Sequence, residues 1–401
     1  MAATGTIQPG DLLLSVPRSA IFSHHELFQV SGPVELAPEH ALLLAILVEA
    51  RKGRESAWYE YLRLLPEQEL ILATWTMQDI ELLQDTELIE SAIAAKRKWK
   101  EVLSTFQQTV STYAKDFTVD DIAWAWSIAA SRSAYMEENA WKESEQSLRP
   151  PKANRSERGP GCTYDGSGVG VLIPLLDMFN HSCYPVSKAG YNPVSNTYDL
   201  IADAAYAAGE QVFIHYGPLS NRELVEHWGF TLRDNPHDSV RLSIFEITRA
   251  ESTPLTDPDL ISAAQILGLE NPLSADASYA IGFARGKASF WDSVPWQLTT
   301  SLQLSALEAR ICDCEHVDLV ETLANGVAVC GCVQKLCISQ LEDALLDRHA
   351  RLQTSVTKAS TAAAPDHVKT AATNYLSCQD DIVQSILRTR TDSISESSGT
   401  G

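Results

Sequence analysis

The sequence predicts an α+β protein: a β-rich domain interrupted by a helical insertion, then an all-α C-terminal domain. Short apolar runs bounded by turn residues occur near the start of the chain and again between residues 169 and 233. Between them, and again beyond 238, apolar residues recur at helical spacing. We therefore expect a first domain over 1–237 and a helical domain over 238–390.

The β-rich parts lie on either side of the insertion. A first strand is predicted at Leu12–Val16, an apolar run after the turn residues Pro9-Gly10-Asp11 and ended by Pro17. Later strands are predicted at Val169–Leu176, Tyr198–Ile201 and Val212–Tyr216. Turn residues separate these runs, as is typical of a small sheet.

The helical insertion is predicted at about 35–160. Its first helix begins at Pro38-Glu39, and two amphipathic helices follow over 79–114 and 119–137. Residues 146–162 are polar and contain Pro-Pro and Gly-Pro pairs, so they are expected to form a loop.

The C-terminal region repeats the helical pattern. Apolar positions at helix period occur over 258–269, 299–312, 317–346 and 365–390. The Ser/Thr/Gly-rich tail, 391–401, is expected to be disordered.

Composition narrows the class of partner. The chain has 31 Lys and Arg against 52 Asp and Glu, a formal net charge of −21, and this field repels nucleic-acid phosphates. Apolar runs such as Ala41–Val48 are too short to span a membrane. Eight cysteines form no dense disulfide framework, and no secretory signal opens the chain. We expect an intracellular monomer, cytoplasmic or nuclear with an organelle left open, that binds a protein substrate but neither nucleic acid nor membrane.

Three segments carry polar side chains near the ends of predicted strands. They are DMFNHS at 177–182, GEQVFIHYG at 209–217 and SNRELVEHWGF at 220–230. Each alone is weak evidence, because a polar turn or a half-buried tyrosine is usually structural. Taken from the residues alone, they indicate a possible site at strand ends.

In this order and spacing, the segments resemble the C-terminal half of a SET domain, of the class that contains the Rubisco large-subunit lysine methyltransferase and the actin-histidine methyltransferase. The resemblance runs from about Gly10 to Arg241 and is densest from Ile173 to Phe230. It implies a SET β-fold with a pseudoknot, and it puts the C-terminal helices in the place of that class's substrate-binding domain.

The resemblance also implies roles for seven residues. Tyr216 would be the catalytic tyrosine, S-adenosylmethionine would be held by Arg132, Asn180 and His181, and the channel would be lined by Asp177, Tyr191 and Trp228. These residue types suit methyl transfer, an in-line displacement whose main requirement is alignment. A phenol oxygen can stabilise developing positive charge, aromatic faces can hold a cation, and a guanidinium suits the cofactor's carboxylate.

The predicted activity is therefore protein-lysine N-methylation of a non-histone protein. Ala134 stands where the actin-histidine class has an Asn that addresses the imidazole, which favours lysine over the alternative, histidine. The class's Gly-containing cofactor loop would precede Ala3–Ile7, so we expect the chain to be truncated. A catalytically silent protein that binds its partner through the C-terminal helices is the other alternative.

The cysteines near the C-terminus pose a separate question. Cys330, Cys332 and Cys337 have the spacing of the zinc motif that follows some SET domains, and Cys183 could supply a fourth ligand. The triplet, however, lies far beyond Tyr216 and in a stretch with helical apolar spacing. We therefore predict buried thiols on a helix face and no metal, and we treat Cys312 and Cys314 in the same way.

Overall fold

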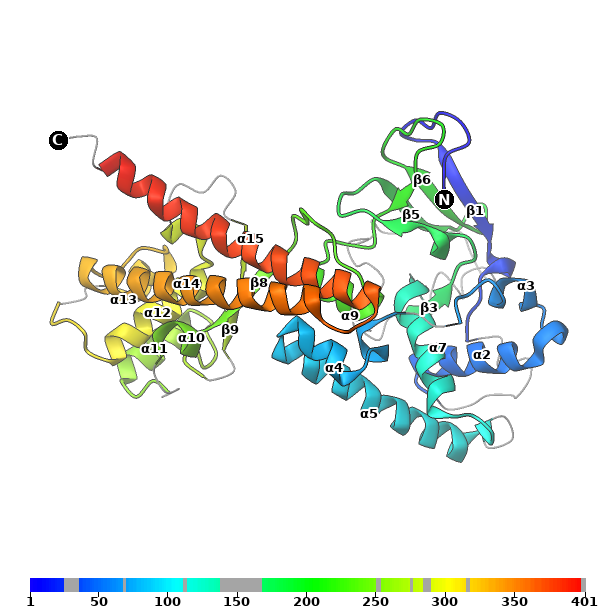
Figure 1. Cartoon of the computed structure of the whole chain (residues 1–401), viewed down its shortest axis with the longest axis horizontal. Coiled ribbons are helices and arrows are strands. Elements are labelled where there is room, and N and C mark those ends of the chain that lie inside the picture. Colours follow the sequence, from blue (N-terminus) through cyan, green and yellow to red (C-terminus); the bar gives the residue numbers. More distant parts are fainter. Residues whose placement is uncertain are drawn as a thin grey trace. The chain divides into compact units, whose positions relative to one another are not determined.

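The protein is described here by a computed structural model, shown in Figure 1. The structure describes residues 1–24, 36–67, 70–110, 114–137, 168–249, 254–274, 277–283, 290–314 and 318–397. The loop predicted at 146–162 lies outside these residues. Two compact units divide the chain, an N-terminal unit, Met1–Thr231, and a C-terminal unit, Leu232–Gly401.

A three-stranded antiparallel sheet forms the β-rich part of the N-terminal unit. Its order is β1 (Leu12–Pro17), β6 (Thr197–Ala202), β5 (Ser187–Asn192), with Val16 opposite Tyr198 in the β1–β6 register. Val16, Tyr198 and Leu200 are buried in one apolar cluster with Ile173, Phe179 and Val212. The sheet therefore packs against the segments that flank the candidate site.

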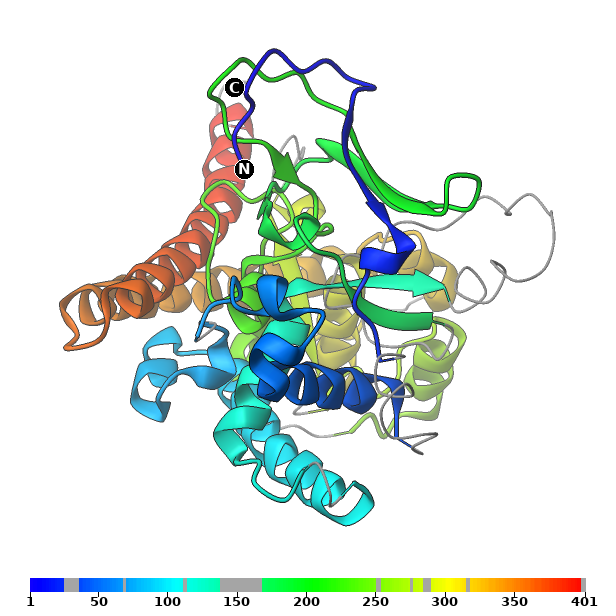
Figure 2. The same cartoon turned by 90° about the vertical axis from the view of Figure 1, so that its right-hand side faces the viewer.

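The helical insertion forms a second core in this unit. Its helices are α2 (Pro38–Lys52), α3 (Tyr59–Leu62), α4 (Met77–Ile80), α5 (Thr86–Thr109) and α7 (Val119–Arg132). Every residue from Ala41 to Val48 is buried, so α2 is covered on all sides. The strand β3 (Gly168–Leu172) lies against α2, since a Cβ at Gly170 would touch Leu42 at 3.5 Å (Figure 2).

The predicted helix over 119–137 is wrong at its C-terminal end. Helix α7 ends at Arg132, and Ser133–Glu137 form β2, which pairs antiparallel with β3 and places Ser133 opposite Leu172. Apolar spacing over one turn does not separate a strand from a helix, and here the β3 backbone decides the outcome by offering hydrogen-bond partners. As a consequence, Arg132 lies at a helix-to-strand junction.

The C-terminal unit is mainly helical, as predicted. Its helices are α10 (Ile244–Thr248), α11 (Pro258–Ile266), α12 (Trp296–Glu308), α13 (Leu319–Ala324), α14 (Gly331–Thr361) and α15 (Asp366–Ser397). The long helices α14 and α15 lie side by side as a hairpin (Figure 1). The unit also contains an antiparallel ladder of β8 (Ser239–Ser243) and β9 (Ser278–Gly282), which the prediction of an all-α domain omitted.

Two other boundaries in this unit differ from the prediction. The helix predicted over 317–346 is broken in two, because Gly326 adopts a φ of 69° after α13 and α14 begins only at Gly331. Helix α15 extends to Ser397, so residues 391–397 are helical rather than disordered, and 398–401 lie outside the described residues. Among the helices of the described ranges, none has the length and apolar character needed to cross a bilayer.

Candidate active site

A short parallel pairing brings two of the three polar segments together. Strand β4 (Asn180–His181) pairs with β7 (Phe213–Ile214), with Asn180 opposite Phe213 and His181 opposite Ile214. The backbone N–H of Ser182 extends the ladder by donating to the Ile214 carbonyl at 2.8 Å. Parallel strands need a long connection, and here the chain between them forms β5 and β6. The ladder therefore fixes the Asn-His turn beside the strand that leads into Tyr216.

The Tyr216 hydroxyl lies at this turn. It donates a hydrogen bond to the Phe179 carbonyl oxygen at 2.7 Å, and the Tyr216 backbone N–H donates to Nδ1 of His181 at 3.1 Å. The two rings stack with centroids 4.9 Å apart. Since Nδ1 accepts, the neutral His181 ring carries its proton on Nε2. The structure therefore brings Tyr216 and the Asn180-His181 turn together, across 35 positions of sequence.

Trp228 also stacks with the tyrosine ring. Its ring lies 5.3 Å from that of Tyr216, at an interplanar angle of 29°. Its indole Nε1 donates to the Ser131 carbonyl at 2.8 Å, next to Arg132 at the end of α7. Tyr216 is half-buried and stacks with two other rings, so its side chain has little freedom to rotate.

The helix that carries Trp228, α9 (Asn221–Trp228), was not predicted. The Ser220 hydroxyl accepts from the Glu223 backbone N–H, and the Glu223 carboxylate accepts from the Ser220 N–H, which makes a capping box. The S-x-x-E spacing in the sequence is the signal that could have identified this helix start.

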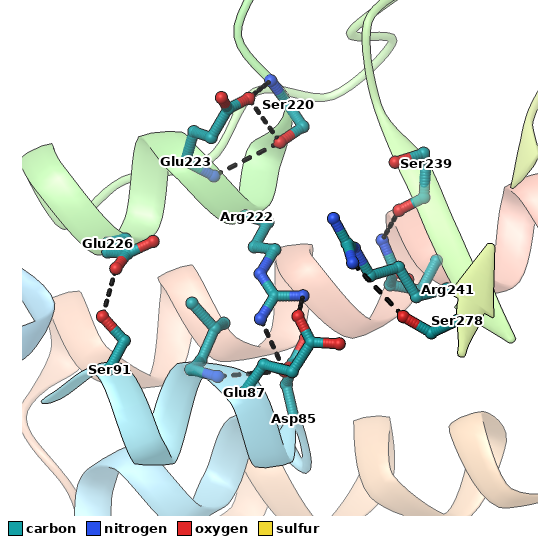
Figure 3. A network of polar contacts seen from close by, with 12 residues as sticks. Asp85, Glu87, Ser91, Ser220, Arg222, Glu223, Glu226, Ser239, Arg241 and Ser278 are labelled. Atoms are coloured by element: carbon teal, nitrogen blue, oxygen red, sulfur yellow. Dashed lines mark hydrogen bonds and ion pairs between the residues drawn. The ribbon is translucent and has the colours of Figure 1, made fainter. Parts of the chain in front are cut away.

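Polar contacts anchor α9 to the N-terminal turns of α5, as Figure 3 shows. The Arg222 guanidinium pairs with Glu87 at 2.8 Å and with Asp85 at 3.4 Å, and the Ser91 hydroxyl donates to Glu226. The Arg222 side chain is only 18% exposed, so solvent screens these pairs incompletely.

Gly229 ends α9 where the chain passes very close to another backbone. Its φ is 72°, and a Cβ built at this position would lie 1.8 Å from the Leu70 carbonyl oxygen. Only glycine fits both the left-handed conformation and this close approach. The end of α9, and with it the position of Trp228, is therefore fixed by backbone as well as side chains.

Arg132 and Asp177 form the polar side of the site. Nη1 of Arg132 donates to the Asp177 carbonyl at 3.0 Å and lies 3.7 Å from the Asp177 carboxylate. The Tyr61 hydroxyl donates to the same carboxylate at 2.8 Å. Burial raises the pKa of Asp177, while the Tyr61 hydrogen bond and the Arg132 charge oppose that rise. Burial and the neighbouring carboxylate together raise the pKa of Tyr61, which therefore stays protonated as a donor.

The sequence did not identify Tyr61 as a residue of the site. It lies on α3, 116 positions before Asp177, and no local motif connects the two. The other carboxylate oxygen, Oδ1 of Asp177, is buried and has no hydrogen-bond partner among the described residues. Asn180 is exposed, on the strand next to it.

Tyr191 is placed differently from the other predicted site residues. It lies on β5, and its hydroxyl donates to the Asn196 side chain at 2.6 Å within the same hairpin. Its ring packs at the edge of the apolar cluster under the sheet. A role for Tyr191 in lining a channel stays a prediction.

The cysteine prediction holds only for Cys337, which is fully buried on α14. Cys312 and Cys314 lie in the segment that follows α12, outside any helix, and Cys314 is exposed. Cys330 is the N-cap of α14 and Cys332 is exposed in its first turn. The expectation of buried thiols on a helix face is therefore wrong for these four, because α12 ends before Cys312 and α14 begins only at Gly331 with its first turn exposed at Cys332.

Comparison with known families agrees with the geometry. The SET-domain family matches residues 1–217, more than half of the 401-residue chain, and this span includes Arg132, Asn180, His181 and Tyr216. SET domains define a class of methyltransferases. The chain belongs to the SET-domain family.

Similar curated proteins come from two groups. SET domain-containing protein 4 of Mus musculus is 25% identical over 361 residues, covering 86% of this chain and 75% of that protein. Actin-histidine N-methyltransferase of Danio rerio is 28% identical over 267 residues, covering 61% of this chain but 39% of that protein. The similarity to the second group is thus confined to a part of each protein.

Solved structures share the fold. Rubisco LSMT bound to sinefungin and monomethyllysine matches with a TM-score of 0.61 at 19% identity, over 98% of this chain and 85% of that chain. The same protein bound to AdoMet matches with a TM-score of 0.59 and the same coverage. The match extends through both units, so the predicted order of a SET fold followed by a helical region is confirmed.

Proposed function

We propose that this chain is an S-adenosylmethionine-dependent protein-lysine N-methyltransferase that acts on a non-histone protein. The observation that carries the proposal is the position of Tyr216, whose hydroxyl lies 2.7 Å from the Phe179 carbonyl oxygen and whose ring stacks with those of His181 and Trp228. Membership of the SET-domain family supports the reaction class, and solved structures of the same fold contain AdoMet or AdoHcy.

The polar side chains of the site fit this cofactor. The Arg132 guanidinium would pair with its carboxylate, and the buried Oδ1 of Asp177, which lacks a partner among the described residues, would accept from its ammonium group. Asn180 is exposed beside them and would contribute hydrogen bonds, with His181 holding the turn. When bound, the cofactor supplies an electrophilic methyl group on a sulfonium sulfur.

Tyr216 and Phe179 would position the acceptor. The phenol oxygen and the carbonyl oxygen place two negative dipole ends next to one another, and such a pair stabilises positive charge on an amine. Because the Tyr216 ring stacks with two others and its hydroxyl is hydrogen-bonded, these dipoles would need no rearrangement during the reaction. The aromatic faces would exclude water, which lowers the pKa of a lysine amine and favours its neutral, nucleophilic form.

The choice of lysine over histidine rests on one position. Ala134, on β2 beside Arg132, has no side-chain donor or acceptor with which to orient an imidazole ring. The partial similarity to actin-histidine N-methyltransferase keeps histidine as the second candidate.

Transfer of labelled methyl groups to proteins of a cell extract tests the proposal. We expect label on protein, and tandem mass spectrometry of the labelled peptides should place it on lysine side chains. Methylhistidine in those peptides would establish the second candidate instead. Titration calorimetry with S-adenosylmethionine tests the enzyme class itself: absence of both binding and labelling would leave a catalytically silent binding protein.

A further inference from the structure

Two Cys-x-Cys pairs from separate segments of the C-terminal unit lie close together, and three of their four sulfurs form one group. The first pair, Cys312 and Cys314, follows the end of α12. The second pair, Cys330 and Cys332, lies at the start of α14, where Cys330 is the N-cap. The pairs are 16 positions apart in the chain and are separated by α13, so only the fold brings them together.

Three of the four sulfur atoms lie at distances that suit ligands around a common centre. The Sγ atoms of Cys312, Cys314 and Cys330 all lie within 4.8 Å of one another, and those of Cys312 and Cys330 are 3.6 Å apart. Cys332, two positions after Cys330 in the first turn of α14, interacts with the Cys314 thiol but is not one of the three sulfurs within 4.8 Å of one another. A tetrahedral Zn²⁺ with Zn–S bonds of about 2.3 Å separates its sulfurs by about 3.8 Å. A disulfide would need a separation of about 2.0 Å, and all four cysteines are free.

The start of α14 places a hydrogen-bond donor and a positive potential beside the Cys330 sulfur. The Val333 backbone N–H donates to Sγ of Cys330 at 3.4 Å, and the N-terminus of the 31-residue helix α14 provides a positive potential. Cys314 and Cys332 are exposed while Cys312 and Cys330 are partly buried, so an ion can reach the sulfurs from solvent.

We propose that Cys312, Cys314, Cys330 and Cys332 bind one Zn²⁺ ion as a structural site. Four thiolates fill a tetrahedral shell and leave no position for a substrate, which is the arrangement of structural rather than catalytic zinc. The ion would tie the segment after α12 to the first turn of α14. Among the described residues, the neighbouring apolar cluster has four buried members, Leu260, Ala264, Leu304 and Leu323, so a metal link would add substantially to the stability of this region.

This ligand set differs from the one that the sequence spacing suggested. Cys337 is 0% accessible to solvent and is buried on α14 together with Val333 and Leu341. Cys183 belongs to the N-terminal unit. Replacing these two by Cys312 and Cys314 gives the symmetrical pattern of two Cys-x-Cys pairs.

Metal analysis of the full chain, purified with a thiol reductant and without chelator, tests the proposal. We expect one zinc per chain by plasma mass spectrometry, and after exchange with Co²⁺ the intense visible absorption of a tetrahedral thiolate site. Cys312→Ser and Cys330→Ser should each lose the zinc and the cobalt spectrum. Cys183→Ser and Cys337→Ala are the matched controls and should keep both.

Three results would overturn the site. The first is wild-type protein that is folded by circular dichroism, contains no zinc and develops no cobalt spectrum. The second is zinc that is lost in a control variant but kept in Cys312→Ser. The third is a Cys312–Cys330 disulfide, found by peptide mapping of the reductant-purified, metal-free protein. Because every readout is metal content or spectroscopy, the outcome is independent of methyltransferase activity.

Discussion

The Tyr216 site and the four-cysteine site both unite distant parts of the sequence, but they are held by different interactions. At the Tyr216 site, the β4–β7 ladder, the 2.7 Å bond to the Phe179 carbonyl and the close approach at Gly229 all involve backbone atoms. The four cysteines meet between a segment without regular structure and the start of a helix, beside a small apolar cluster. The first site is therefore organised by the fold itself, whereas the second would depend on an ion to hold it together.

The largest expected effect is the loss of turnover in Tyr216→Phe. This change removes the hydroxyl that donates to Phe179 but keeps the ring that stacks with His181 and Trp228, so we expect methyl transfer to fall by about 100-fold or more. Calorimetry should show that S-adenosylmethionine still binds, and the melting temperature should change little. Tyr279→Phe is the matched control, since it removes a phenol that is hydrogen-bonded to Ser301 in the C-terminal unit. Equal activity in the two variants would remove Tyr216 from the mechanism.

Gly229→Ala tests the dependence of the Tyr216 site on backbone approach. The added Cβ would overlap the Leu70 carbonyl oxygen, so we expect a loss of more than about 2 kcal/mol in the free energy of unfolding. Gly209→Ala is the control, because Gly209 also has a positive φ of 89° but open space around it; its cost should be about 1 kcal/mol. Urea denaturation of both variants measures the difference, and equal costs would show that the chain relaxes freely around residue 229.

Removal of zinc should loosen the C-terminal unit locally. After treatment with a chelator, amide hydrogen exchange should speed up in residues 304–314 and in the first turns of α14, because the proposed link between them is gone. Exchange in the β1–β6 ladder should be unchanged, since its hydrogen bonds lie in the other unit. Mass spectrometry of peptides measures both regions in one experiment. Uniform acceleration along the whole chain would contradict a local role for the ion.

The smallest expected effect concerns the pH dependence of stability. Because the pKa of Asp177 is raised in the folded state, the folded protein holds this proton more tightly than the unfolded chain does. Below its unfolded pKa of 3.8, Asp177 is protonated in both states and does not reduce the free energy of unfolding. As the pH rises from there through the folded pKa, ionisation of Asp177 lowers the free energy of unfolding. The amide in the Asp177→Asn variant cannot ionise. The urea midpoint of this variant should therefore fall less than that of the wild type over this pH interval. A steeper fall in the variant would show that the Tyr61 hydrogen bond and the Arg132 charge outweigh burial and stabilise the ionised form of Asp177.

Sequence patterns identified the residues of the Tyr216 site better than the secondary structure around it. Asn180, His181, Tyr216 and Trp228 lie within 50 positions and carry a recognisable order, and the structure brings them together. The β2 strand was taken for helix because five residues with mixed apolar spacing fit either structure, and the pairing with β3 decided between them. Tyr61 could not be found, since its contact with Asp177 spans 116 positions.

The sequence by itself determined the SET-domain class, the order of a β-rich domain and a helical region, and the net negative charge, because these depend on local motifs, periodicity and composition. Only the tertiary structure decided which side chains share a site. It gave Asp177 its Tyr61 donor and made two Cys-x-Cys pairs converge, because such contacts depend on how distant elements pack in three dimensions.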